Sequence, residues 1–176
     1  SRYDYAYALK LAERAGKSTH SDLFRLLRAL AERRELNIQS IMNLKLEITG
    51  SDLADFQLFC HENEADEQLV NYLYDLEAKL RNEQLIDFIR AVSPAIYRIF
   101  MRLIRMQIPD IDCYIHNSRG ASYDRWKFEK MRHSDNTDLQ NFHAESTVNS
   151  SSLTELILQL HLPETVKESA QQLREL

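Results

Sequence analysis

Hydrophobic residues recur at helical spacing through residues 84–108, the most regular stretch of the chain. Seven apolar positions follow one another there at alternating steps of four and three, namely Leu85, Ile89, Val92, Ile96, Ile99, Leu103 and Met106. This spacing places them on one stripe of an α-helix, and we expect that stripe to belong to the core. Pro94 lies inside the pattern, where a proline costs a helix about 3 kcal/mol. The segment therefore predicts a kinked or broken helix that packing holds together.

The same periodicity predicts helices over most of the preceding chain. Residues 3–15, 22–48 and 64–81 carry apolar positions at helical spacing. Ser21 has the side chain of an N-cap for the second of these helices, and Gly50 is placed to end it. Each helix therefore has one face that needs a partner, as in a bundle.

Residues 109–150 lack this periodicity and contain only short helical pieces, such as 122–132. So long an irregular segment is uncommon in a compact domain, and we expect it to carry function or to be disordered. After it, Ser152 and Glu155 have the spacing of a capping box. Pro163 then opens the last predicted helix.

Composition agrees with a helical fold. The 176 residues include only three glycines and three prolines, while helix-forming residues are abundant. The predicted fold class is therefore all-α, a multi-helix bundle of about six to nine helices. Two cysteines do not form a disulfide framework, and no apolar run is long enough to span a bilayer. We expect a reduced, cytoplasmic location without membrane contact.

Charge is unevenly distributed along the chain. The formal net charge is −5, so any nucleic-acid contact must be local. Residues 52–77 hold eight acidic side chains and no Lys or Arg, whereas residues 119–132 hold five basic and two acidic ones. Two interpretations remain open: a basic face for a phosphate backbone, or ordinary solvated helix faces.

Several kinds of chemistry find no support in the sequence. There is no glycine-rich phosphate loop, nucleotide-binding fingerprint or nucleophile elbow. Potential metal ligands occur as Cys60-His61 and as Cys113 with His116, but these pairs are irregular and unlike each other. We therefore expect no metal site and no cofactor.

Three segments resemble a known family: residues 3–9 (YDYAYAL), residues 87–94 (DFIRAVSP) and the tail 160–176. The family is that of the type III-A CRISPR-associated ribonucleases, which join a ring-nucleotide sensor domain to a helical HEPN nuclease domain. The resemblance implies a helical linker or bundle region over residues 1–108. It implies a partial HEPN-like helical region over residues 109–176 that ends before the expected catalytic motif. Because both ends of the chain lie in helical patterns, we interpret it as a piece of a longer protein.

The resemblance also implies a function. Members of the family cleave single-stranded RNA in antiviral defence without a metal, and two protomers form one site. Single-stranded RNA and a second copy of the chain are therefore the expected partners in the full-length protein. A cyclic oligoadenylate would bind only through the sensor domain, which this sequence lacks. The alternative is a non-catalytic all-α protein-interaction module; DNA recognition by a helix-turn-helix is disfavoured by the acidic balance.

The catalytic signature of that family is an arginine with four to six residues between it and a histidine. Histidine suits proton transfer, and arginine can stabilise the charge that develops on the phosphate. Arg14 and His20 have this spacing, but Gly16 and Ser18 between them indicate a helix end and a turn. We interpret the pair as a chance match, expect no catalytic residue in this chain, and expect the fragment alone to be inactive.

Two groups of basic residues are candidates for RNA binding. The first shares a helical stripe and comprises Arg98, Arg102 and Arg105. The second is interleaved with Trp126 and Phe128 and comprises Arg125, Lys127, Lys130 and Arg132. Basic residues beside aromatic rings suit single-stranded RNA, through phosphate attraction and base stacking. Alternatively, the arginines pair with the acidic helices of residues 52–77, and both aromatic residues belong to the core.

Overall fold

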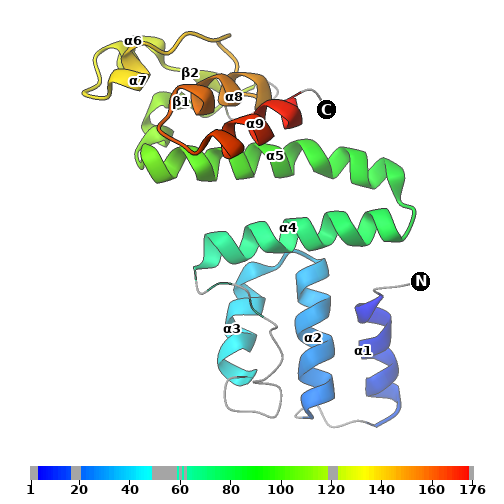
Figure 1. Cartoon of the computed structure of the whole chain (residues 1–176). Helices are drawn as coiled ribbons and strands as arrows, with labels where there is room; N and C mark the ends of the chain where they lie inside the picture. Colours follow the sequence, from blue (N-terminus) through cyan, green and yellow to red (C-terminus); the bar gives the residue numbers. More distant parts are fainter. Residues whose placement is uncertain are drawn as a thin grey trace. The chain divides into compact units, whose positions relative to one another are not determined.

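Helices make up nearly all of the regular structure, which confirms the predicted all-α fold class (Figure 1). The computed structural model describes residues 4–16, 21–48, 59, 61, 63–118 and 123–174. The chain forms two compact units, Ser1–Val92 and Ser93–Leu176. The boundary between these two units falls inside a long helix. The boundary expected from the family resemblance, between a helical linker region (1–108) and a HEPN-like region (109–176), stays a prediction. No helix in the described part is long and apolar enough to cross a membrane.

Four helices of the described residues lie wholly within the first unit. They are α1 (Tyr5–Arg14), α2 (Asp22–Arg34), α3 (Ile38–Ile48) and α4 (Glu64–Arg81). In Figure 1 the first three lie side by side, and α4 crosses the ends of α2 and α3. Ser21 caps α2 as predicted, because its hydroxyl accepts the Phe24 N–H at 3.3 Å.

The single helix predicted over 22–48 is wrong, because the chain breaks between α2 and α3. Leu36 adopts a left-handed backbone with φ of 55°, which a continuous helix cannot contain. Asn37 follows, and its side-chain oxygen accepts the Ser40 N–H at 3.4 Å, as an N-cap does. The turn therefore depends on an asparagine cap. The apolar periodicity continues across this turn and so did not predict it. Gly50, the helix end predicted from the sequence, lies outside the described residues.

Charged side chains join α2 to α4 inside the first unit. Arg33 pairs with Glu67 and donates to the Asn71 side-chain oxygen, and all three residues are buried. Farther along the same two helices, Asp75 pairs with Arg34 at 2.5 Å and also with Lys79. Glu67 and Asp75 are among the eight acidic residues of 52–77, so this acidic segment is not simply a solvated face.

The long helix α5 (Leu85–Gln107) continues through Pro94 without interruption, so a broken helix is wrong. Its buried side chains all lie in the C-terminal part, namely Ala95, Ile96, Phe100, Met101 and Ile104. The predicted core stripe is therefore only partly right. Ile96 is buried, while Val92, Ile99 and Leu103 are half-buried. Leu85, Ile89 and Met106 are exposed, at 58%, 69% and 64%.

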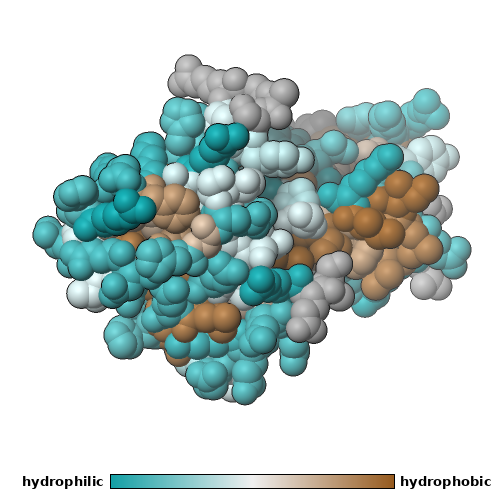
Figure 2. All heavy atoms as spheres, turned by 90° about the horizontal axis from the view of Figure 1, so that it is seen from above, coloured by the Kyte–Doolittle hydropathy of each residue, from teal (hydrophilic) through white to brown (hydrophobic). Residues whose placement is uncertain are grey.

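The reason for this difference is geometric. Steps of four and three define a stripe, but they do not say which neighbouring stripe meets another element. Ile96, Phe100 and Ile104 form an adjacent stripe, and this stripe is the one that is covered. On the face shown in Figure 2, hydrophilic residues predominate and hydrophobic residues form separate smaller patches.

Residues 109–149 contain short elements that sequence periodicity did not resolve. They are the 3-10 helix η1 (Ile111–Tyr114), strands β1 (Ile115–His116) and β2 (Arg125–Trp126), and helices α6 (Phe128–Arg132) and α7 (Thr137–Gln140). The strands pair antiparallel, with Ile115 opposite Trp126. The helical piece predicted over 122–132 is therefore wrong at Arg125 and Trp126, which form β2, while residue 122 lies outside the described residues.

The chain ends in two helices, α8 (Ser150–Gln159) and α9 (Glu164–Arg174). Pro163 precedes α9 directly, as predicted. A capping box does open α8, but it consists of Asn149 and Ser152 and not of Ser152 and Glu155. The Asn149 side chain accepts the Ser152 N–H at 2.9 Å, and the Ser152 hydroxyl accepts the Asn149 N–H at 3.1 Å.

Candidate nucleic-acid interface

Strand β2 turns successive side chains to opposite sides. Arg125 is exposed, whereas Trp126 is 5% exposed and packs edge-to-face on Phe142, with ring centroids 5.2 Å apart. The indole N–H of Trp126 donates to the Ser152 hydroxyl at 3.1 Å. Phe128 is half-buried and lies 6.2 Å from the Phe142 ring. Trp126 is thus a core residue, and its predicted use as a stacking surface for RNA is wrong.

Two lysines after β2 converge on one backbone oxygen. Lys127 Nζ and Lys130 Nζ donate to the carbonyl of Cys113 at 3.2 and 3.3 Å, and Lys130 also lies 5.1 Å from the centroid of the Tyr114 ring. Both lysines are exposed. Within the described ranges, neither has a carboxylate at ion-pair distance. A neutral carbonyl does not cancel two positive charges, so the pair creates a local positive potential in an acidic protein.

The two arginines nearby differ in how far their charge is compensated. Arg132 pairs with Glu129 at 2.7 Å, an exposed pair within α6. Arg125 stands opposite His116 across the β-ladder, and no carboxylate of the described residues pairs with it. Arg125, Lys127 and Lys130 therefore form the uncompensated part of the second predicted group, and we call these three residues the β2–α6 cationic surface.

In the first predicted group, on α5, Arg105 has a carboxylate partner close by in the chain. Arg105 makes two hydrogen bonds to Asp112, from Nε at 2.9 Å and from Nη2 at 2.8 Å. These bonds hold the pKa of Asp112 below its ordinary value of 3.8. Arg98 donates from Nη1 to the Pro94 carbonyl at 3.0 Å, and Arg102 is half-buried. The suggested pairing with acidic residues of 52–77 is wrong for Arg105, whose carboxylate partner lies just beyond the end of its own helix.

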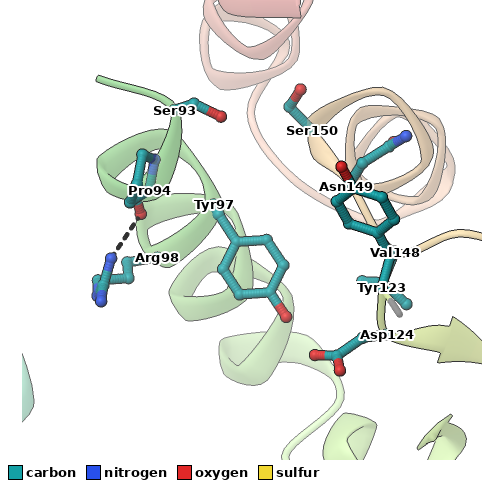
Figure 3. Close-up of a pocket in the computed structure, with 9 residues that line it drawn as sticks. All are labelled: Ser93, Pro94, Tyr97, Arg98, Tyr123, Asp124, Val148, Asn149 and Ser150. Carbon is teal, nitrogen blue, oxygen red and sulfur yellow. Dashed lines mark hydrogen bonds between the residues drawn. The ribbon is translucent and has the colours of Figure 1, made fainter. Parts of the chain in front are cut away.

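A pocket of about 470 Å³ lies within the second unit, between α5, the segment before β2 and the start of α8 (Figure 3). Its lining mixes apolar, aromatic and polar side chains and includes Tyr97, Arg98, Tyr123, Asp124 and Asn149. Only Arg98 among these was singled out from the sequence. The others come from three separate segments without a shared motif, so no sequence signal brought them together.

Asp124 is held in place at the inner side of this pocket. Its Oδ1 accepts the Ser118 N–H at 3.0 Å, and its backbone carbonyl accepts the Val148 N–H at 2.8 Å. Figure 3 shows the Tyr97 hydroxyl pointing toward the Asp124 carboxylate. Burial, followed by the negative charge of Asp124, raises the pKa of Tyr97 above its ordinary value of 10.0. The phenol therefore keeps its proton at neutral pH and can donate a hydrogen bond.

The interpretation of Arg14 and His20 as a chance match stays a prediction. Arg14 is the last residue of α1 and is exposed, while His20 lies outside the described residues. The described residues contain no group of three or more His, Cys, Asp or Glu side chains placed to hold a metal ion.

These features define an α-helical protein that carries a cationic surface and a pocket lined by aromatic and polar residues among apolar ones. The sequence profile of the Cas_Csm6 HEPN domain matches residues 58–176, more than half of the chain. The chain therefore belongs to this family of type III CRISPR-associated HEPN ribonucleases, which confirms the resemblance carried by its sequence. The matched region begins before α4 and includes α5. No curated protein matches the chain.

Proposed function

We propose that this chain is the helical region of a metal-independent endoribonuclease of antiviral defence, and that it contacts single-stranded RNA through the β2–α6 cationic surface. The observation that supports the contact is the convergence of Lys127 and Lys130 on one carbonyl, without a carboxylate partner in the described residues. Phosphates along an RNA strand would supply the missing negative charge. Family membership favours this function over a non-catalytic interaction module.

The finer parts of the proposal follow from the family. The active enzyme would be a homodimer of a type III-A system, in which each protomer supplies half of one site. A cyclic oligoadenylate would act through a sensor domain that is not part of these 176 residues. Arg14 and His20 are the only residues in the sequence with the catalytic spacing, and we propose that they do not catalyse.

The RNA contact is tested by titrating a labelled single-stranded RNA at several salt concentrations. Replacing Lys127 and Lys130 by Ala should weaken binding and lower the salt slope by about 0.7 for each phosphate that is no longer neutralised. Lys10→Ala, at an exposed position of α1, removes the same charge elsewhere and should leave the slope unchanged. Arg132→Ala should have the smaller effect, because Glu129 already compensates that charge. An unchanged slope in a double variant with normal thermal unfolding would refute the contact.

Inactivity of the chain alone is tested by incubating it with the same RNA in the presence of a chelator. We expect little or no cleavage, because the Arg14/His20 pair is interrupted by Gly16. Robust cleavage that disappears in Arg14→Ala or His20→Ala would overturn this expectation and place the active site at the end of α1.

A further inference from the structure

The pocket between α5, β2 and α8 offers two aromatic rings and one carboxylate to the same space. The Tyr97 ring enters from α5, and the Tyr123 ring lies on the opposite side, at the segment before β2 (Figure 3). Tyr123 is 78% exposed, so its ring is open to a ligand that arrives from solvent. A volume of about 470 Å³ is within the range of about 300–1,000 Å³ that small-molecule sites occupy.

The carboxylate of Asp124 sets the hydrogen-bonding character of the pocket. A carboxylate has two oxygens and about four acceptor positions. The Ser118 N–H occupies one of these positions in Asp124, on Oδ1. The Val148 N–H holds the backbone of Asp124 and the Ser118 N–H holds its Oδ1, so the carboxylate is positioned from both ends while its other acceptor positions stay available. The pocket thus calls for a ligand that is flat, stacks on an aromatic ring and donates two adjacent hydrogen bonds.

Among the RNA bases, guanine has this combination. Its N1–H and N2–H groups lie side by side on one edge and match the two oxygens of a carboxylate. Adenine and cytosine place an acceptor next to their amino group, which a carboxylate repels, and uracil has a single N–H between two carbonyls. Single-stranded RNA is read in this way, by stacking unpaired bases on aromatic rings and bonding their edges.

We propose that this pocket is a guanine-binding subsite for single-stranded RNA, with Asp124 as the residue that selects guanine and Tyr123 as the ring on which the base stacks. The proposal rests on the proposed function, since it assumes that RNA reaches the second unit. The Tyr97 hydroxyl faces the same space, so it can donate to the guanine O6. Arg98 at the rim, anchored on the Pro94 carbonyl, adds positive charge beside the RNA backbone.

The test compares four labelled RNAs of equal length: an all-uridine strand, and strands with one central guanosine, adenosine or inosine. We expect the guanosine strand to bind about tenfold more tightly than the all-uridine strand, which is within the range for one bidentate contact. Inosine lacks the N2 amino group and should fall between the two. The adenosine strand should bind like the all-uridine strand.

Asp124→Asn should abolish the guanosine preference, because an amide offers one acceptor and one donor where guanine needs two acceptors. Removal of a negative charge should by itself strengthen binding to every RNA, so a loss confined to guanosine cannot come from charge. Asp135→Asn, at an exposed position of the same unit, makes the same charge change away from the pocket and should keep the preference. Tyr123→Ala should reduce affinity for the guanosine strand more than for the all-uridine strand.

The outcomes separate this inference from the function on which it rests. Equal binding of all four strands, or a guanosine preference that survives Asp124→Asn, overturns the guanine subsite and leaves the cationic RNA surface in place. Failure of every strand to bind overturns both. Two results together support both the cationic RNA surface and the guanine subsite. The Lys127→Ala and Lys130→Ala double variant should weaken binding of all four strands equally, and Asp124→Asn should weaken binding of the guanosine strand alone.

Discussion

Ser152 shows how much one side chain can determine at the scale of a residue. Its hydroxyl accepts hydrogen bonds from the Trp126 indole and from the Asn149 N–H, and it donates to the Thr147 carbonyl at 2.8 Å. One donor and two acceptor positions are all that a hydroxyl has. The residue is fully buried. It therefore connects β2, the loop before α8 and α8 itself.

Replacing Ser152 by Ala should destabilise the protein by about 1–3 kcal/mol, because the buried Trp126 N–H is then left without an acceptor. Denaturant unfolding measures this change. Ser151→Ala is the matched control: this neighbour in α8 is partly exposed, and a change within about 0.5 kcal/mol is expected there. Equal losses of stability in the two variants would show that the hydrogen bonds of Ser152 do not stabilise the fold.

Asp112 gives a residue-scale prediction about pH. Hydrogen bonding by Arg105 lowers its pKa in the folded protein below that in the unfolded chain. The resulting stability is present above the unfolded pKa and is lost as pH falls through the folded pKa. Stability of Asp112→Asn should therefore decline less between about pH 4 and the lower folded pKa. The pair is largely exposed, so we expect a difference of a few tenths of a kcal/mol. Parallel stability curves against pH would contradict the linkage.

At the scale of the element, α5 contains two isoleucines, Ile89 and Ile104, that differ in burial. Ile104 is fully buried, and Ile89 is 69% exposed. Ile104→Ala should cost about 2–5 kcal/mol, the range for a buried aliphatic side chain. Ile89→Ala should change stability by less than about 0.5 kcal/mol. Thermal or denaturant unfolding measures both changes. A larger loss of stability in Ile89→Ala would support the core stripe predicted from periodicity.

The buried ion pair between α2 and α4 gives a second prediction at this scale. Glu67→Gln breaks the buried ion pair with Arg33, and breaking a buried pair costs about 3–5 kcal/mol. Glu77→Gln breaks an exposed ion pair with Arg81 on the same helix and should cost under about 1 kcal/mol. Similar losses of stability in the two variants would mean that the buried pair contributes no more than the exposed one.

The sequence predicted helices well and the packing between them less well. Apolar periodicity located α1, α4 and α5, since a 3.6-residue repeat depends on neighbours in the chain. It missed the break at Leu36, because that break depends on a left-handed residue and an asparagine cap. It left the role of Trp126 open between RNA stacking and the core, and it did not predict the pocket. Both depend on the chain around β2, whose partners Ile115 and Thr147 are distant in sequence.

At the scale of the whole molecule, some charged residues pair with one another, whereas Lys127 and Lys130 do not pair with a carboxylate in the described residues. The net charge of −5 would disfavour RNA overall. In the first unit Glu67 pairs with Arg33, and Asp75 pairs with Arg34 and Lys79, so these three basic side chains are already engaged with carboxylates. Lys127 and Lys130 have a neutral carbonyl partner and remain positive. The proposed RNA contact therefore depends on where the basic residues lie, and not on the sum of charges.

Trp126 also equips the molecule with its own optical probe. It is the only tryptophan in the sequence, and its indole is buried within the second unit. Its fluorescence should therefore shift to longer wavelength when that unit unfolds, whereas circular dichroism sums the helices of both units. We expect Ile104→Ala to lower the denaturant midpoint of the fluorescence signal, and Glu67→Gln to lower the dichroism midpoint while the fluorescence midpoint stays unchanged. Coincident midpoints for both signals in every variant would mean that the two units unfold as one cooperative body.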